Sequence, residues 1–147
     1  SDSSSLFNTL YSGLKFYTQG VSGFVDVKDV SRSLISLTES KISGERFIIS
    51  SENKTYEWLF KTMAKGLNIN PPTIKAGMFL SQLAWRLEWL KSVFTGKPSL
   101  ITNETAYTSQ QIYNYDNSKI TEQLNYRFIP IEETVERVCK LFIAQKQ

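Results

Sequence analysis

Histidine is absent from this chain of 147 residues. Its absence excludes Ser-His-Asp and Cys-His nucleophilic catalysis, histidine general bases and histidine metal ligands. Cysteine is almost absent as well: Cys139 stands alone, so neither an internal disulfide nor a multi-cysteine zinc site can form. We therefore expect no metal site. The scarcity of cysteine is compatible with a reducing compartment, and we expect a cytoplasmic protein.

A concentration of charge of one sign is also missing. The chain has 17 Lys and Arg against 14 Asp and Glu, a formal net charge of +3, and the basic residues are scattered. Nucleic-acid binding needs a concentrated basic face, so the sequence predicts no nucleic-acid partner. No secretory signal is visible, and the polar first residues (SDSSS) lack a methionine, which leads us to expect a piece of a longer protein.

The most informative stretch that is present covers residues 23–30 (GFVDVKDV). Its valines alternate with polar neighbours, which predicts a short strand, and Asp26 can then cap the helix that follows. Asp29, three residues on, suits a capping box, and both carboxylates lie where a helix N-terminus favours negative charge. We expect the helix to continue over residues 31–37 and residues 45–50 (ERFIIS) to form another strand. The two aspartates are thus predicted to be helix caps rather than catalytic acids.

Turn residues and apolar periodicity predict the remaining elements. Further helices are expected over residues 6–11, 56–67, 74–94 and 104–111, over a short segment ending at residue 124, and after Pro130. Short β-like runs are expected over residues 15–18 and 112–115, with a turn over 19–23. Thr55 is the expected N-cap of the helix over 56–67. Asp116 or Asn117 caps the short helix, which Asn125 can end in the left-handed conformation. The expected fold class is α/β, mostly helical with a few short strands.

The helix expected over residues 74–94 carries apolar side chains on two sides. Charged and amide side chains interrupt it, so it is not expected to cross a membrane. These are Lys75, Gln82, Arg86, Glu88 and Lys91. Burial on both sides within the domain is the simplest interpretation; a cover over a substrate cleft, a dimer face and a membrane-surface helix remain alternatives. Cys139 lies on the apolar stripe of the last helix, which predicts a buried, inert thiol.

Three segments, in this order, resemble the second half of the extended short-chain dehydrogenase/reductases. They are SSSLF…GLKFYTQG…GFVDVKDV, RFIISSENKTYEWLF and TGKPSLITNETA…YDNSKITEQLNYRFIPIEETV. The likeness is to the NAD(P)-dependent epimerases and dehydratases, and within them to the dihydroflavonol reductase and hydroxysteroid dehydrogenase-like branch. Asn125 stands where that family usually has glycine, and asparagine tolerates the same backbone conformation.

The resemblance implies that residues 1–147 form a single C-terminal, substrate-binding domain of a longer Rossmann-type enzyme. The parent would transfer hydride to or from a carbonyl or hydroxyl carbon of a small molecule, with NAD or NADP as cofactor. The dinucleotide-binding half, its glycine-rich loop and the catalytic Ser, Tyr and Lys would precede residue 1. This chain alone is therefore expected to bind no cofactor and to catalyse nothing.

By position, the resemblance also implies which residues face the substrate. The candidates are Ser4, Ser5, Phe7, Phe16 and Tyr17. Hydroxyls and aromatic rings suit a polar ring or a planar apolar substrate. The alternative is that Phe7 and Phe16 belong to the core and that the serines only cap the first helix.

Three motif matches are interpreted as coincidences. The family's Tyr-x-x-x-Lys pair occurs at residues 11–15 and at residues 115–119. The pair must share one helix face, whereas Gly13 weakens a helix in the first match and a turn interrupts the second. Residues 20–23 (GVSG) lack the further glycine and the following helix of a dinucleotide fingerprint, so they are predicted to form a turn.

A non-catalytic interaction module is the alternative function. It would use the helix expected over residues 74–94 to bind a partner or a second copy of the chain. In either case a strand such as residues 45–50 would lie at an unpaired sheet edge, which together with exposed apolar surface makes a homodimer possible.

Overall fold

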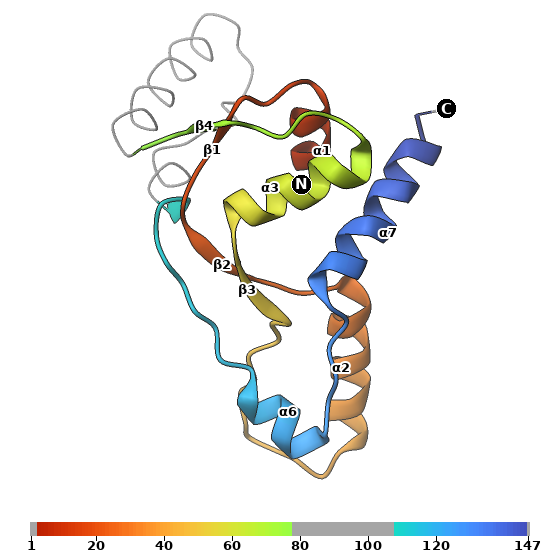
Figure 1. The fold of residues 1–147 in the computed structure, drawn as a ribbon. Coiled ribbons are helices and arrows are strands. Elements are labelled where there is room, and N and C mark those ends of the chain that lie inside the picture. The colour runs from red at the N-terminus through yellow and green to blue at the C-terminus, as the bar shows by residue number, and fades with distance from the viewer. Residues whose placement is uncertain (1–2, 78–107, 147) are drawn as a thin grey trace, which may run out of the picture.

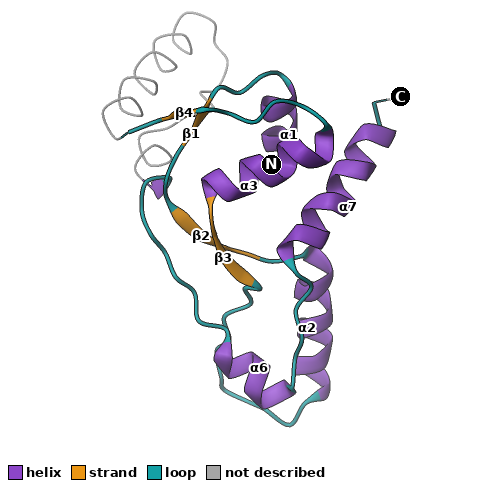
Figure 2. Cartoon of the chain, in the orientation of Figure 1, coloured by secondary structure: helices purple, strands orange, loops and turns teal. Residues whose placement is uncertain are grey.

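The computed structural model describes residues 3–77 and 108–146, which form a small α/β fold (Figures 1 and 2). The described helices are α1 (Ser3–Tyr11), α2 (Val27–Glu39), α3 (Tyr56–Leu67), α6 (Ser118–Leu124) and α7 (Ile131–Ala144). The described strands are β1 (Phe16–Tyr17), β2 (Val21–Phe24), β3 (Glu52–Thr55) and β4 (Ile74–Lys75). Helices α1, α3 and α7 gather at one end, while α2 and α6 lie at the other (Figure 1). The predicted mixture of helices and short strands is confirmed.

The strands form two small sheets. Strands β2 and β3 are antiparallel, and β1 and β4 are parallel. Val21 also forms a parallel bridge with Ile112, so the chain around residue 112 flanks β2 on the side away from β3. Gly20 lies in this crowded place, because a Cβ there would stand 2.3 Å from the carbonyl oxygen of Ser109. The turn predicted over residues 19–23 is wrong, because residues 21–23 belong to strand β2.

The core lies between α1, α3 and α7, where apolar side chains of the three helices interlock. Its buried members are Phe7, Leu10, Leu59, Phe60, Met63, Ala64, Leu67, Ile131, Val135 and Cys139. The apolar residues of α3 are buried because they recur every three or four residues and so share one helix face. Gly66 lets α3 and α7 approach closely: a Cβ there would lie 2.7 Å from the Cys139 sulfur.

The predicted helix ends are confirmed wherever they depend on local chemistry. Thr55 Oγ1 accepts a hydrogen bond from the Trp58 amide at 3.0 Å, which caps α3. Asn125 ends α6 in the left-handed conformation, with φ of 47°. Asp116 accepts from the Ser118 amide at 2.9 Å and so caps α6, whereas Asn117 makes no cap hydrogen bond. Pro130 directly precedes α7.

Two predicted strands and one predicted helix start are wrong. The strand before α2 ends at Phe24, because Asp26 already caps the helix and Val27 is its first residue. Residues 45–50 are neither strand nor helix, and the strand after α2 is β3 instead. Residues 74 and 75 pair with β1 rather than opening a helix. The rest of the helix predicted over 74–94, from residue 78 on, lies outside the described residues, as do residues 104–107 of the one predicted over 104–111.

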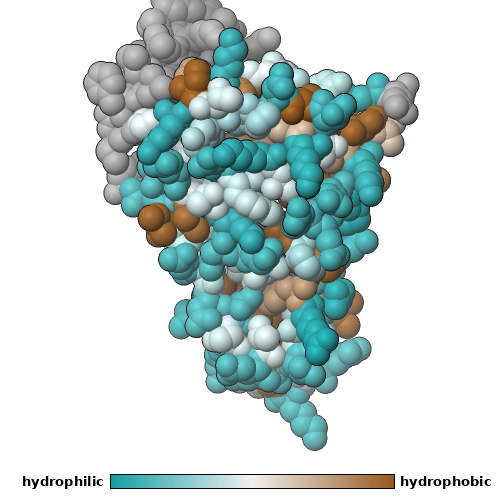
Figure 3. All heavy atoms as spheres, in the orientation of Figure 1, coloured by the Kyte–Doolittle hydropathy of each residue, from teal (hydrophilic) through white to brown (hydrophobic). Residues whose placement is uncertain are grey.

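Among the described helices, none is long and apolar enough to cross a membrane. Hydrophilic residues cover most of the face drawn in Figure 3, and patches of hydrophobic residues interrupt them.

Candidate functional site

The five predicted substrate-facing residues lie on α1 and β1, two elements that both pack against α3. Phe7 is buried in the core, with its ring centroid 5.8 Å from that of Phe142, so its side chain serves packing. Ser5 is exposed on the surface of α1. Ser4 belongs to the same helix. The alternative weighed for Phe7, that it is a core residue, is thus confirmed.

Phe16 and Tyr17 have different surroundings although they are neighbours in β1. Phe16 is 44% exposed, so it is not a core residue. Tyr17 is half-buried and packs against the core. Phe16 stands opposite Ile74 in the parallel register, and Ile74 is equally exposed. Together these two side chains form an apolar surface, which we call the β1–β4 surface.

Backbone hydrogen bonds hold the β1–β4 surface in place. The Ile74 amide donates to the Lys15 carbonyl at 3.0 Å, and the Ala76 amide donates to the Tyr17 carbonyl at 2.7 Å. The Gln110 side chain donates in turn to the Ala76 carbonyl at 2.6 Å. The surface is therefore ordered by ladder bonds on both sides of Phe16, which suits a preformed contact for an apolar or planar group.

Asp26 is fully buried, and its carboxylate contacts both α2 and α7. Its carboxylate accepts from the Lys28 amide at 2.8 Å, which caps α2, and from the Thr134 hydroxyl of α7 at 2.8 Å. It also forms an ion pair with Arg137 of α7. Burial alone would raise the pKa of Asp26, but the hydrogen bonds from Lys28, Thr134 and Arg137 outweigh it, so the pKa lies below its ordinary value. At neutral pH the ionised carboxylate accepts hydrogen bonds from both α2 and α7 and so fastens the two helices together.

Asp29 is also fully buried but does not complete the predicted capping box. Its carboxylate accepts from the Tyr126 hydroxyl at 3.0 Å, the Ile129 amide at 2.8 Å and Arg32 at 3.2 Å. Burial, and then the hydrogen bond and charge of Asp29, raise the pKa of Tyr126 to about 12. Tyr126 is therefore a hydrogen-bond donor at neutral pH rather than an acid–base catalyst. Both aspartates act in structure, as predicted, although Asp29 does so by a different contact.

The two Tyr-x-x-x-Lys matches do not form pairs on one helix. Tyr11 is the last residue of α1, and Gly13 has a φ of +94° between it and Lys15. The Tyr115 backbone is held by Asn53 of β3, through bonds of 2.9 and 3.0 Å. Lys119 lies in α6 and binds Glu45 at 2.6 Å. Neither match places the ammonium beside the phenol along one helix face.

Cys139 is fully buried in α7, and its thiol donates to the Met63 carbonyl with a sulfur–oxygen distance of 3.6 Å. Burial, followed by the charge of Glu136, raises the pKa of this thiol, which disfavours the nucleophilic thiolate. Within residues 3–77 and 108–146, no cluster of three or more Cys, Asp and Glu could hold a metal ion.

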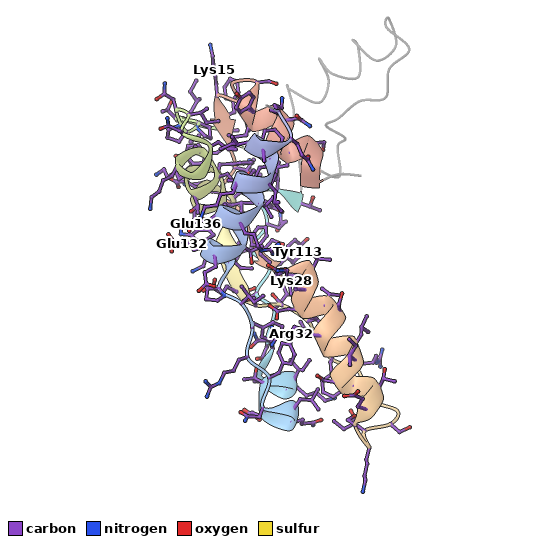
Figure 4. The ribbon with its side chains drawn as sticks, turned by 90° about the vertical axis from the view of Figure 1, so that its right-hand side faces the viewer. Lys15, Lys28, Arg32, Tyr113, Glu132 and Glu136 are labelled. Atoms are coloured by element: carbon purple, nitrogen blue, oxygen red, sulfur yellow. The ribbon has the colours of Figure 1, made fainter. Side chains whose placement is uncertain are left out.

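Two shallow hollows open on the described surface. One, of about 430 Å³, lies between α2 and the end of α6 and is lined by Arg32, Ile35, Ser36, Leu124, Asn125, Tyr126 and Arg127. Figure 4 shows Arg32 in the space between these two helices. The other, of about 330 Å³, lies on α7 and is lined by Glu133, Glu136, Arg137, Lys140 and Leu141. Neither includes a predicted substrate-facing residue.

Comparison with solved structures shows a likeness of fold. No protein-family model matches the chain, and no curated protein matches it. A solved crystal structure, that of gox2253, superposes on 99% of this chain with a TM-score of 0.73 at 20% sequence identity. The match covers 44% of the gox2253 chain, so this chain spans less than half the length of that protein. The likeness establishes a shared fold.

Proposed function

We propose that this chain is the substrate-binding part of an NAD(P)-dependent enzyme of the extended short-chain dehydrogenase/reductase family. One observation carries the proposal: nearly all of the chain superposes on less than half of gox2253, as expected of one part of a larger enzyme. The order of motifs points the same way, since it resembles the second half of the family. In this proposal the fold is the C-terminal portion of a cytoplasmic Rossmann-type enzyme.

In the proposed enzyme, NAD or NADP supplies the hydride chemistry and is held by residues that precede this chain. The described residues contribute binding and orientation. The β1–β4 surface offers the Phe16 ring and the Ile74 side chain to an apolar or planar part of a small-molecule substrate. Ser5, exposed on α1, offers a hydroxyl. The two fully buried carboxylates, Asp26 and Asp29, are held by structural partners and leave proton transfer to other residues.

Cofactor binding tests the proposal. Thermal melts are measured with and without millimolar NAD(H) and NADP(H), for the 147-residue chain and for the gene product that includes the residues before Ser1. We expect no shift for the 147-residue chain and a clear rise in Tm for the longer product, because a ligand stabilises only the protein that binds it. A shift for the shorter chain, or none for the longer product, would contradict the proposal.

Substrate turnover by the longer product tests the role of the β1–β4 surface. Phe16→Ala should raise KM more than it lowers kcat, because a ring that only binds substrate contributes to uniform binding. Tyr113→Ala is the matched control, since Tyr113 is an aromatic residue that is similarly exposed (42%) and lies outside this surface. If the two substitutions had equal effects on KM and kcat, the proposal that Phe16 contacts the substrate would be wrong.

The alternative, an interaction module built on the helix predicted over residues 74–94, stays a prediction. Nearly all of that helix lies outside the described residues. Light scattering on Phe79→Asp and Trp89→Asp variants tests it, and a molar mass that does not change in folded variants would count against self-association there.

A further inference from the structure

The hollow between α2 and the end of α6 brings positively charged side chains from two elements together. Arg32 belongs to α2, and Arg127 belongs to the segment that follows α6. None of the described residues that line the hollow is acidic. The hollow lies at the opposite end of the molecule from α1, β1 and β4, so it is separate from the β1–β4 surface (Figure 1). It is therefore a second place where a ligand, and an anion in particular, could bind.

The Arg32 guanidinium is held in position although it is partly exposed. Its Nη1 donates to the Asp29 carboxylate at 3.2 Å, and the guanidinium lies over the Tyr126 ring, 5.4 Å from the ring centroid. The Tyr126 ring is itself fixed, because its hydroxyl donates to Asp29 at 3.0 Å. The Arg32 side chain is 54% exposed, and the bond to Asp29 uses one of the five N–H donors of a guanidinium. Arg32 therefore presents further donors to the hollow (Figure 4) and would lose little freedom on binding a ligand.

Arg127 supplies a positive charge that no described residue balances. Within residues 3–77 and 108–146, its side chain has no hydrogen bond, ion pair or ring contact, and the residue is exposed. The charge of Arg32, by contrast, is offset by the fully buried Asp29. The arginines that line the hollow and their ion-pair partner thus leave an excess of one positive charge, which Arg127 contributes. An anion in the hollow would be attracted mainly by Arg127.

Two neutral polar side chains, those of Ser36 and Asn125, also line the hollow. Other hydroxyls of α2, those of Ser31, Ser33 and Thr38, donate to backbone carbonyls of the helix itself. The Ser36 hydroxyl is half-buried and has no hydrogen-bond partner in the described part of the chain, and the same holds for the Asn125 side-chain amide. Both groups can therefore donate to a ligand.

The size and the lining of the hollow favour an organic phosphate. Its volume, about 430 Å³, leaves room for more than a phosphate group, and Ile35 and Leu124 add apolar surface beside the donors. A phosphate group presents three acceptor oxygens in different directions, which suits donors that come from α2 and from residues 125–127. A carboxylate has two oxygens in one plane and would satisfy fewer of these donors.

We propose that this hollow binds a small organic phosphate. Arg32 and Arg127 hold the phosphate group, and the two neutral polar side chains donate further hydrogen bonds to it. The organic part of the ligand lies against Ile35 and Leu124. The proposal does not depend on the proposed function, because every residue that it uses belongs to the described part of this chain.

Titration with phenyl phosphate, a simple member of this class, tests the proposal. Isothermal titration calorimetry on the 147-residue chain should show saturable binding with a Kd on the order of 1 mM, as expected of a small ligand in a shallow hollow. Inorganic phosphate, benzoate and phenol each lack part of the proposed ligand and should bind more weakly by roughly tenfold or more. The absence of saturable binding, or equally tight binding of any of these three compounds, would overturn the proposal.

A pair of substitutions tests the role of Arg127. Arg127→Gln should weaken the binding of phenyl phosphate by roughly tenfold or more, because it removes a charge-assisted contact. Arg46→Gln is the matched control, since it removes the same charge from an exposed arginine that does not line the hollow, and it should change affinity by less than about twofold. Neither side chain has a partner in the described part of the chain, so both variants should fold and melt as the parent does. Equal losses of affinity would refute a specific site.

Backbone amide chemical shifts, followed by NMR during the titration, locate the ligand. The largest changes should occur at Ser36, Asn125 and Arg127, whereas Phe16 and Ile74 of the β1–β4 surface should not change. Largest changes at the β1–β4 surface would overturn the proposal. Binding in the hollow by a chain whose longer gene product does not bind NAD(P) would contradict only the proposed function, and cofactor binding without phosphate binding in the hollow would contradict only this inference.

Discussion

Replacing Asp26 by alanine should destabilise the protein more than the loss of an ordinary helix cap. The carboxylate is fully buried and accepts from the Lys28 amide, the Thr134 hydroxyl and Arg137. Losing the cap costs about 1 kcal/mol. A hydrogen bond to a charged acceptor, such as that from Thr134, contributes about 1.5 kcal/mol. The Arg137 side chain is 35% exposed, so solvent limits the loss of its ion pair to about 1 kcal/mol.

Together these losses predict that Asp26→Ala lowers the free energy of unfolding by about 3–4 kcal/mol. For a domain of this size, that corresponds to a fall in Tm of roughly 10 °C. Urea denaturation followed by circular dichroism measures the change. Asp116→Ala is the matched control, because Asp116 caps α6 from an exposed position and should cost only about 1 kcal/mol. Equal losses for the two variants would refute the claim that Asp26 fastens α2 to α7.

The pH dependence of stability in a second variant, Asp26→Asn, provides an independent check. The folded state lowers the pKa of Asp26 below the ordinary value of 3.8, so the unfolded chain binds the proton more readily. The stabilisation from Asp26 is therefore fully present above about pH 4 and is lost as the pH falls through the folded-state pKa. The difference in unfolding free energy between the parent and Asp26→Asn should be constant above pH 5 and shrink below pH 4. A difference that grows on acidification would contradict the assignment.

Two further predictions concern contacts between distant parts of the chain. Gly66→Ala should destabilise the folded protein by about 1–3 kcal/mol despite the better helix propensity of alanine, because its Cβ would stand 2.7 Å from the Cys139 sulfur. Adding Cys139→Ala to this variant should recover part of the lost stability, as measured by urea denaturation. No recovery would argue against this contact. Tyr126→Phe should lower the free energy of unfolding by about 1–3 kcal/mol, because the buried Asp29 carboxylate loses a hydrogen-bond donor. A Tm equal to that of the parent would show that the hydroxyl contributes nothing.

Elements that depend on local chemistry were predictable from the sequence. The bounds of α3 follow from Thr55 and the periodic apolar residues after it, and the end of α6 follows from the tolerance of asparagine for a positive φ. Cap and backbone preferences act within a few residues of the chain, so the sequence displays them directly. The structural role of Asp26 was predictable for the same reason, because its cap bond reaches only to Lys28.

Elements that depend on distant partners were not predictable. Residues 45–50 have strand composition but lack a pairing partner among the described residues, and composition alone cannot supply one. Within the candidate site, the sequence left open whether Phe7 and Phe16 belong to the core. The structure buries Phe7 against Phe142 of α7 and leaves Phe16 44% exposed on the β1–β4 surface. No sequence signal links Asp29 to Tyr126, which is 97 residues away.

By itself the sequence determined which chemistries are excluded and where most of the helices lie, since these depend on residue type and on short-range preference. The buried face of α3 also follows from its sequence, but only the tertiary structure decided which face of α2 is buried. For α2 that decision runs against the usual rule: the buried carboxylates find their partners in residues 126–137, and Val27, Leu34 and Ile35 remain outside. Burial is a property of what packs against a residue, and the packing partners of these side chains are far apart in the sequence.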